Sequence, residues 1–121
     1  MRLWLAAMIA VTVIATGCSR SNAPKQNAAS SQASAPDLMI QYGCPTCHVI
    51  PNVPGAVGKV GPSLDDLAQR SYLAGTLQNS PENLVHWIQH PQQIHPGTAM
   101  PEMGVTSADA ARIANFLQTN K

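Results

Sequence analysis

The short segment Cys44-Pro45-Thr46-Cys47-His48 limits what this chain can fold into more than any other part of the sequence. Two cysteines three positions apart on a helical turn point to the same side, and His48, four positions after Cys44, belongs to the same face. This is the spacing of a c-type haem attachment site. It predicts one haem c (heme c), bound covalently through thioethers at Cys44 and Cys47, with His48 as the proximal iron ligand. A solvent-facing Cys-x-x-Cys beside a histidine is the alternative.

The small size and balanced charge of the chain exclude some functions and favour a cofactor. Its 121 residues are enough for one small domain with appended sequence. Charged residues make up 11% of the chain and the formal net charge is +1, so no basic patch indicates nucleic-acid binding. Domains of this size usually need a staple or a cofactor, and a haem supplies a large apolar group that the few aromatic residues do not.

Residues 1–17 have the features of a bacterial secretory signal peptide. Arg2 precedes an apolar run over residues 3–16, which is shorter than the ~20 residues that a membrane-spanning helix needs. Ala15-Thr16-Gly17-Cys18 is similar to a lipobox, although Leu usually stands where this chain has Ala15. Haem attachment would leave Cys18 as an odd cysteine in an oxidising compartment, and lipidation gives it a purpose. We therefore expect a lipid anchor at Cys18; an uncleaved signal anchor is the alternative.

The remaining sequence divides into a linker and one domain. Residues 18–35 are predicted to form the lipidated cysteine and a flexible tether, because small polar residues dominate and no apolar periodicity is present. The folded domain is expected over residues 36–121. Its capping residues, prolines and apolar spacing predict four short helices: residues 36–42, residues 64–70 after Ser63, residues 81–89 after Ser80, and a terminal helix after Thr106. No strand pair is evident, so an all-α fold of short helices and long loops around the haem is expected.

The occupant of the second axial position decides whether the iron only carries electrons or also binds small molecules. A methionine sulfur and a second imidazole are both reasonable ligands, although a buried methionine is more often core filler. Pro96 and Pro101 flank a turn that could hold a methionine rigidly. The candidates downstream of the motif are Met100, Met103, His86, His90 and His95.

With these motifs in order, the chain resembles the class I c-type cytochromes over about residues 36–121. It is particularly similar to the small bacterial monohaem domains associated with respiratory oxidases. The stretches that carry the resemblance are residues 44–48, Gly61-Pro62-Ser63-Leu64, residues 83–88, residues 96–101 and the terminal amphipathic helix. The resemblance implies the cytochrome c fold.

The resemblance also implies roles for individual residues. Met100, the methionine of the family's Pro-Gly-Thr-x-Met-Pro loop, is the expected distal ligand, and Met103 is expected to pack near the haem edge. The carbonyl of Pro62 should accept the other N–H of the proximal imidazole, which fixes the ring. Arg70, Asn79 and Thr98 are expected to bond the propionates, and Trp87 to lie near the distal ligand. Surface, turn and core roles are the alternatives for Arg70, Asn79 and Trp87.

An iron held by His48 and Met100 has no vacant site, so the expected function is electron transfer rather than an enzyme activity. We expect a monomer that carries single electrons in a bacterial respiratory chain, anchored in the cell envelope and facing the periplasm or the exterior. Expected partners are redox proteins such as a membrane oxidase or a quinol-oxidising complex. Six basic side chains balance six acidic ones once the signal peptide is removed, so docking should be largely non-ionic.

Three other functions remain open on the sequence. The chain could be a fixed haem subunit of a larger oxidase or dehydrogenase. It could be a haem enzyme or gas sensor with a labile distal ligand, which carbon monoxide binding would reveal. A thiol oxidoreductase would also use Cys-x-x-Cys, but no βαβ pattern surrounds the motif.

Overall fold

The computed structural model describes residues 33–120, so the predicted signal peptide, Cys18 and most of the predicted tether lie outside the described residues. Five α-helices, one 3-10 helix and one pair of short strands are present in this range. Their bounds are α1 Ala35–Gln41, α2 Cys44–Cys47, η2 Leu67–Gln69, β1 Tyr72–Leu73, β2 Leu77–Gln78, α3 Pro81–Gln89, α4 Pro91–Ile94 and α5 Ser107–Thr119. None of these helices is both long and apolar enough to cross a bilayer.

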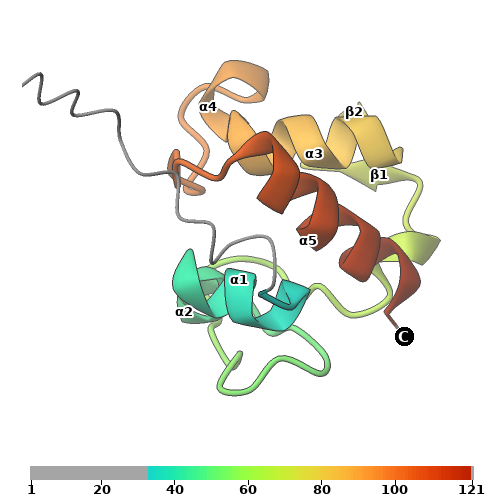
Figure 1. The fold of residues 1–121 in the computed structure, drawn as a ribbon. Coiled ribbons are helices and arrows are strands. Elements are labelled where there is room, and N and C mark those ends of the chain that lie inside the picture. Colours follow the sequence, from blue (N-terminus) through green and yellow to red (C-terminus); the bar gives the residue numbers. More distant parts are fainter. Residues whose placement is uncertain (1–32, 121) are drawn as a thin grey trace, which may run out of the picture.

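Helices α3 and α5 form the main packing pair of the described domain, and α5 also contacts α1 (Figure 1). Both helices begin at the predicted caps: Ser80 accepts a hydrogen bond from Asn83 N, and Thr106 accepts one from Asp109 N. Such side-chain caps satisfy backbone N–H groups that the first turn leaves without partners. The buried faces of α3 and α5 belong to one hydrophobic cluster, which includes Leu84, Ile88, Ile113, Ala114 and Leu117. The predictions of these two helices are confirmed.

Helix α1 begins slightly earlier than the sequence predicts. Ser34 caps it in a capping box, in which its side chain accepts from Asp37 N while the Asp37 carboxylate accepts from Ser34 N. Leu38 and Met39 on its inner side are fully buried. The last residues assigned to the tether therefore belong to the folded part of the chain.

The helix predicted over residues 64–70 is wrong, because only the 3-10 turn η2 forms there. Ser63 does not cap a helix: its side chain bonds the Asp65 carboxylate and accepts from Asp65 N, which favours a tight turn. Asp66 then has a left-handed backbone with φ of 52°. The carbonyls of Ser63 and Asp65 accept hydrogen bonds from Arg70, while the N–H groups of Leu67 and Gln69, which an α-helix would direct to them, bond Leu64 O and Asp66 O.

The expectation that no strands pair is also wrong over residues 72–78. Strands β1 and β2 are antiparallel, with Tyr72 opposite Gln78 and Leu73 opposite Leu77. The connecting turn has positive φ at Ala74 and at Gly75. With only two residues in each strand, the alternation of polar and apolar residues is too short to be recognised in the sequence.

A buried carboxylate joins α1 to α5. Asp109 is only 1% exposed, accepts a 2.7 Å hydrogen bond from the Tyr42 hydroxyl and pairs with Arg112, which also donates to Ala33 O. Burial alone would raise the pKa of Asp109, but the surrounding hydrogen bonds outweigh burial and hold this pKa below its ordinary value. The ionised carboxylate therefore stabilises the contact between the two helices.

Removing this carboxylate should destabilise the domain more at neutral pH than in acid. Because the pKa of Asp109 is lowered by folding, its contribution is fully present above the ordinary carboxyl pKa of ~3.9 and is lost as pH falls through the lower folded-state value. We expect Asp109→Ala to lower the free energy of unfolding by about 2–4 kcal/mol at pH 7. Tyr42→Phe, which removes one hydrogen bond, should cost about 1 kcal/mol. Denaturant titrations at pH 7 and below pH 4 test this, and a gap between wild type and Asp109→Ala that stays equally large in acid would contradict it.

Candidate functional site

A cavity of about 540 Å³ lies inside the domain and is lined mainly by apolar side chains. Its volume is within the ~300–1,000 Å³ typical of small-molecule and cofactor sites. Its walls come from most of the described elements: α1, α2, the loop before η2, the β1 turn, α3, the loop after α4, and α5. The short helices and long loops therefore enclose one shared space.

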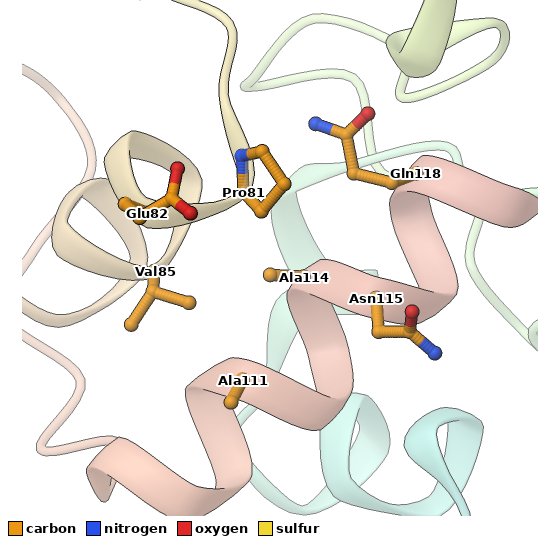
Figure 2. A pocket seen from close by; sticks show the side chains of 7 residues that line it. All are labelled: Pro81, Glu82, Val85, Ala111, Ala114, Asn115 and Gln118. Atoms are coloured by element: carbon orange, nitrogen blue, oxygen red, sulfur yellow. The ribbon is translucent and has the colours of Figure 1, made fainter.

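A second hollow lies between α3 and α5 and carries a different set of residues (Figure 2). Its volume is about 410 Å³, and the side chains that line it are Pro81, Glu82, Val85, Ala111, Ala114, Asn115 and Gln118. No cysteine, histidine or methionine is among them. The larger cavity instead contains both cysteines and the histidine of the Cys-x-x-Cys-His segment.

The Cys-x-x-Cys-His segment forms one wall of that larger cavity. Its two cysteines bound the single turn of α2, as the spacing predicts, and both are half-buried. His48 follows in an extended conformation, so it lies just beyond the helix rather than on its face as predicted. All three side chains still line the same cavity.

A hydrogen bond orients the imidazole of His48. Its Nδ1 lies 2.7 Å from Pro62 O, and because a carbonyl only accepts, Nδ1 carries the proton of this bond. In the neutral ring the lone pair is then on Nε2, which is the tautomer that a metal ligand needs. The expected contact between Pro62 and the imidazole is thus present.

Two glycines allow the loop before η2 to pack directly on α2 and His48. A Cβ at Gly61 would stand 2.7 Å from Nδ1 of His48, and a Cβ at Gly58 would stand 2.6 Å from the carbonyl carbon of Cys47. Backbone hydrogen bonds hold the loop in this position, from Gly61 N to Cys47 O (2.8 Å) and from Gly58 N to Pro45 O (3.2 Å). Only residues without a side chain permit this approach.

The candidates for a second axial ligand separate into two groups. Met100, Met103 and His95 line the cavity. His86 and His90 do not: their rings meet edge to face with centroids 5.7 Å apart, and His90 Nδ1 lies 3.6 Å from the Glu102 carboxylate. The geometry therefore removes two of the three downstream histidines from consideration as ligands within this cavity.

Three of the four residues expected to contact the haem periphery also reach the cavity. Arg70, Trp87 and Thr98 line it. Asn79 does not, and its amide is already used: Nδ2 donates to Leu67 O and Arg70 O, both at 2.8 Å, and Oδ1 accepts from Gln118. The amide of Asn79 thus organises η2 and α5 and offers no donor to a propionate.

Sequence reasoning missed Gln92, which bonds the loop that carries Thr98 and Met100. Its Nε2 donates to the carbonyls of Thr98 and Met100, both at 2.8 Å, and its Oε1 accepts from Gly97 N at 3.2 Å. Gln92 lies in α4, a four-residue helix that was not predicted. No local pattern distinguishes it from the nearby glutamines, since its partners are five to eight residues away.

The residues of the cavity fit a covalent haem. An apolar space with two thiols on one wall, an oriented imidazole beside them, thioether side chains and one guanidinium matches the parts of that group. Burial raises the pKa of the Cys44 thiol above its ordinary value, so this thiol is protonated at neutral pH.

Comparison with known proteins relates the chain to subunits of respiratory oxidases. Over 62 residues it is 38% identical to cytochrome c oxidase subunit 2 of Alkalihalophilus pseudofirmus, covering 50% of this chain and 17% of that protein. Over 81 residues it is 28% identical to cytochrome c oxidase subunit 2 of Bacillus sp. strain PS3, covering 65% of this chain and 23% of that protein. The chain thus spans about a fifth of the length of these relatives. No protein-family model and no solved structure matches it.

These relatives correct one expectation. The sequence predicted a protein that is not an enzyme. Each relative, however, is a subunit of an oxidase, and an oxidase is an enzyme complex. An oxidase-related role is therefore what the comparisons support, over the part of each relative that this chain matches. The assignment to the class I cytochromes, the haem and the lipid anchor stay predictions.

Proposed function

We propose that the described residues form a c-type cytochrome domain that passes single electrons in connection with a respiratory oxidase. One observation carries this proposal: both thiols of the Cys-x-x-Cys-His segment and its oriented imidazole line a single cavity of cofactor size. The cytochrome c fold, with short helices and loops around one haem c, is part of the same proposal. The similarity to oxidase subunit 2 supports the connection with an oxidase.

The proximal wall would attach and hold the cofactor. Each thiol, at Cys44 and at Cys47, would add across one vinyl group, with sulfur bonding to one carbon and the thiol hydrogen passing to the other, so no oxidant is consumed. The hydrogen bond from Nδ1 to Pro62 O would leave Nε2 of His48 to bind the iron and would make the ring a stronger donor.

The opposite side of the cavity would supply the second ligand and the polar contacts. We assign Met100 as the distal ligand, since it lies in the loop between α4 and α5 and lines the cavity. Arg70 uses one guanidinium nitrogen, Nη2, for the carbonyls of Ser63 and Asp65. Its other N–H groups suit a propionate, and Thr98 offers a hydroxyl. Trp87 contributes apolar wall.

This arrangement suits electron transfer. When bound, the haem supplies an iron that changes reversibly by one electron between its ferrous and ferric states. Two protein ligands would leave the iron without an open position, and the apolar lining would exclude water. The thioether of Met100 favours the reduced state, which raises the potential relative to a second imidazole.

The partner that the observations favour is a membrane oxidase at the outer face of a bacterial membrane. The relatives are oxidase subunits, so an oxidase is the expected electron acceptor, with the domain acting either as a part of that complex or close to it. Residues 1–32 lie outside the described range, and a lipid on Cys18 of this segment is our proposed attachment to the membrane. Co-purification of an oxidase with the chain after mild detergent extraction tests this context.

Covalent attachment is tested by substitutions at the cysteines. In the full chain made in a host competent for cytochrome c maturation, we expect one haem per polypeptide by the pyridine haemochrome assay. The double variant Cys44→Ser/Cys47→Ser should lose all haem that resists acid–acetone extraction, because no thiol remains in the cavity. Cys18→Ser is the matched control. This variant should keep the haem, and only the share of the protein that is recovered with the membranes should change. Equal amounts of acid–acetone-resistant haem in the double variant and the wild type would refute covalent attachment at α2.

A further inference from the structure

The segment that carries Met100 has almost no regular structure of its own. Residues 97–101 belong to no helix or strand, and Gly97 has a left-handed backbone with φ of 83°. Within this segment the backbone makes few bonds: Thr98 N donates to His95 O at 3.1 Å, and Met100 N lies 3.4 Å from Thr98 Oγ1. Its conformation must therefore depend on contacts from outside the loop.

The side chain of Gln92 supplies those contacts. Both hydrogens of Nε2 are used, one for Thr98 O and one for Met100 O, and Oε1 accepts the N–H of Gly97. The half-buried amide of Gln92 thus makes the hydrogen bonds with this loop that a neighbouring strand would make in a sheet. The two carbonyls that it binds belong to Met100, the expected iron ligand, and to Thr98.

The backbone of Gln92 is itself held in place by its neighbours. The preceding residue, Pro91, is fully buried and begins α4. The backbone N–H of Gln92 donates to the Glu102 carboxylate at 3.3 Å, and the same carboxylate lies 3.6 Å from His90 Nδ1. Contacts therefore connect the end of α3, Gln92 and the residues that follow the ligand loop.

We propose that Gln92 is a positioning residue for the distal iron ligand: its amide holds the backbone of Met100 so that the sulfur stays at the iron. This inference rests on the proposed function, in which Met100 is that ligand. The required chemistry is two donors and one acceptor on one planar group, which glutamine has. Glutamate has a similar shape but no donor when ionised, and leucine has neither donor nor acceptor.

The test uses exogenous imidazole, which binds the ferric iron only after the methionine has left. We expect Gln92→Leu and Gln92→Glu to raise the apparent affinity of the ferric holoprotein for imidazole at least tenfold, a change of about 1.4 kcal/mol in the opening of the loop. Gln93→Leu is the matched control, because Gln93 is the next residue of α4 and is exposed. Amide hydrogen exchange at Gly97 in the holoprotein should also become at least tenfold faster in Gln92→Leu and stay unchanged in Gln93→Leu.

The outcomes separate this inference from the proposed function. A wild-type ferric protein without the sulfur-to-iron near-infrared band would remove Met100 as ligand and overturn this inference, whereas the covalent haem at α2 is tested separately by the cysteine variants. Suppose instead that the wild type shows this band and that Gln92→Leu and Gln92→Glu bind imidazole with affinities within twofold of the wild-type affinity. That result would overturn the role of Gln92 and leave the haem site intact. Gln92→Glu preserves the shape of the side chain, so it reports on the donors even where Gln92→Leu folds poorly.

Discussion

Replacing Met100 with alanine is expected to abolish the near-infrared sulfur-to-iron band of the ferric protein, whereas Met103→Ala should retain it. Both methionines are half-buried and line the cavity, so the two variants remove similar side chains from similar surroundings. Only the loss of an iron ligand would change the coordination of the metal. Loss of the thioether should also lower the reduction potential by on the order of 0.1 V, within the ~0.8 V range that axial ligands span.

A vacant distal position should make the iron reactive toward gases. We expect the reduced Met100→Ala protein to bind carbon monoxide at neutral pH, while the wild type and Met103→Ala do not. Absorption spectra before and after addition of carbon monoxide measure this directly. Loss of the band in Met103→Ala with retention in Met100→Ala would reverse the assignment, and carbon monoxide binding by the wild type would favour a gas sensor or haem enzyme.

Adding one methyl group at Gly61 should disturb the proximal ligand. The new Cβ would stand 2.7 Å from Nδ1 and 2.9 Å from Nε2 of His48, closer than van der Waals contact allows. The imidazole or the loop must move, which weakens the hydrogen bond to Pro62 O. We expect Gly61→Ala to lower the free energy of unfolding of the holoprotein by about 2–3 kcal/mol and to reduce the haem yield.

Gly75→Ala is the control for this substitution. No atom lies within 4 Å of a Cβ at Gly75, but its φ is +81°, so alanine there meets only backbone strain of about 1 kcal/mol. Guanidinium titrations of the two holoproteins and their haem contents measure the difference. If the two alanine variants lose equal stability and bind equal amounts of haem, close packing of Gly61 on the imidazole does not support the proximal site.

The parts of the fold that depend on local chemistry could be predicted from the sequence. Ser80 and Thr106 cap α3 and α5 through bonds to residues three positions later, a distance at which sequence patterns are informative. The single turn of α2 agrees with the spacing of the Cys-x-x-Cys-His segment. For the same reason Ser34 could have been recognised as the cap of α1, since Asp37 completes a capping box.

Elements that depend on side-chain partners more than one helical turn away could not be predicted in this way. The sequence of residues 64–70 is compatible with a helix, but Arg70 draws the carbonyls of Ser63 and Asp65 to its guanidinium and a turn forms instead. Asn79 was expected to bond a propionate, yet its amide bonds to η2 and α5. Such competition between partners becomes visible only in three dimensions.

The residues of the site likewise divide into those that local sequence patterns predict and those that they do not. The spacing of Cys44, Cys47 and His48 brings them to one wall of the cavity by local geometry alone. Gln92 has no such signal, because its function depends on where the loop of residues 97–100 passes. A glutamine in a polar sequence is indistinguishable from its neighbours until its hydrogen bonds are known.

The most direct test of the central claim is tandem mass spectrometry of the peptide that contains residues 44–48, taken from the mature protein of a maturation-competent host. A covalent haem between the α2 thiols predicts one added haem mass, fragments that place it on both cysteines, and no reaction of either sulfur with an alkylating reagent. A peptide of unmodified mass whose two cysteines are alkylated, or are joined in a disulfide, would contradict the claim.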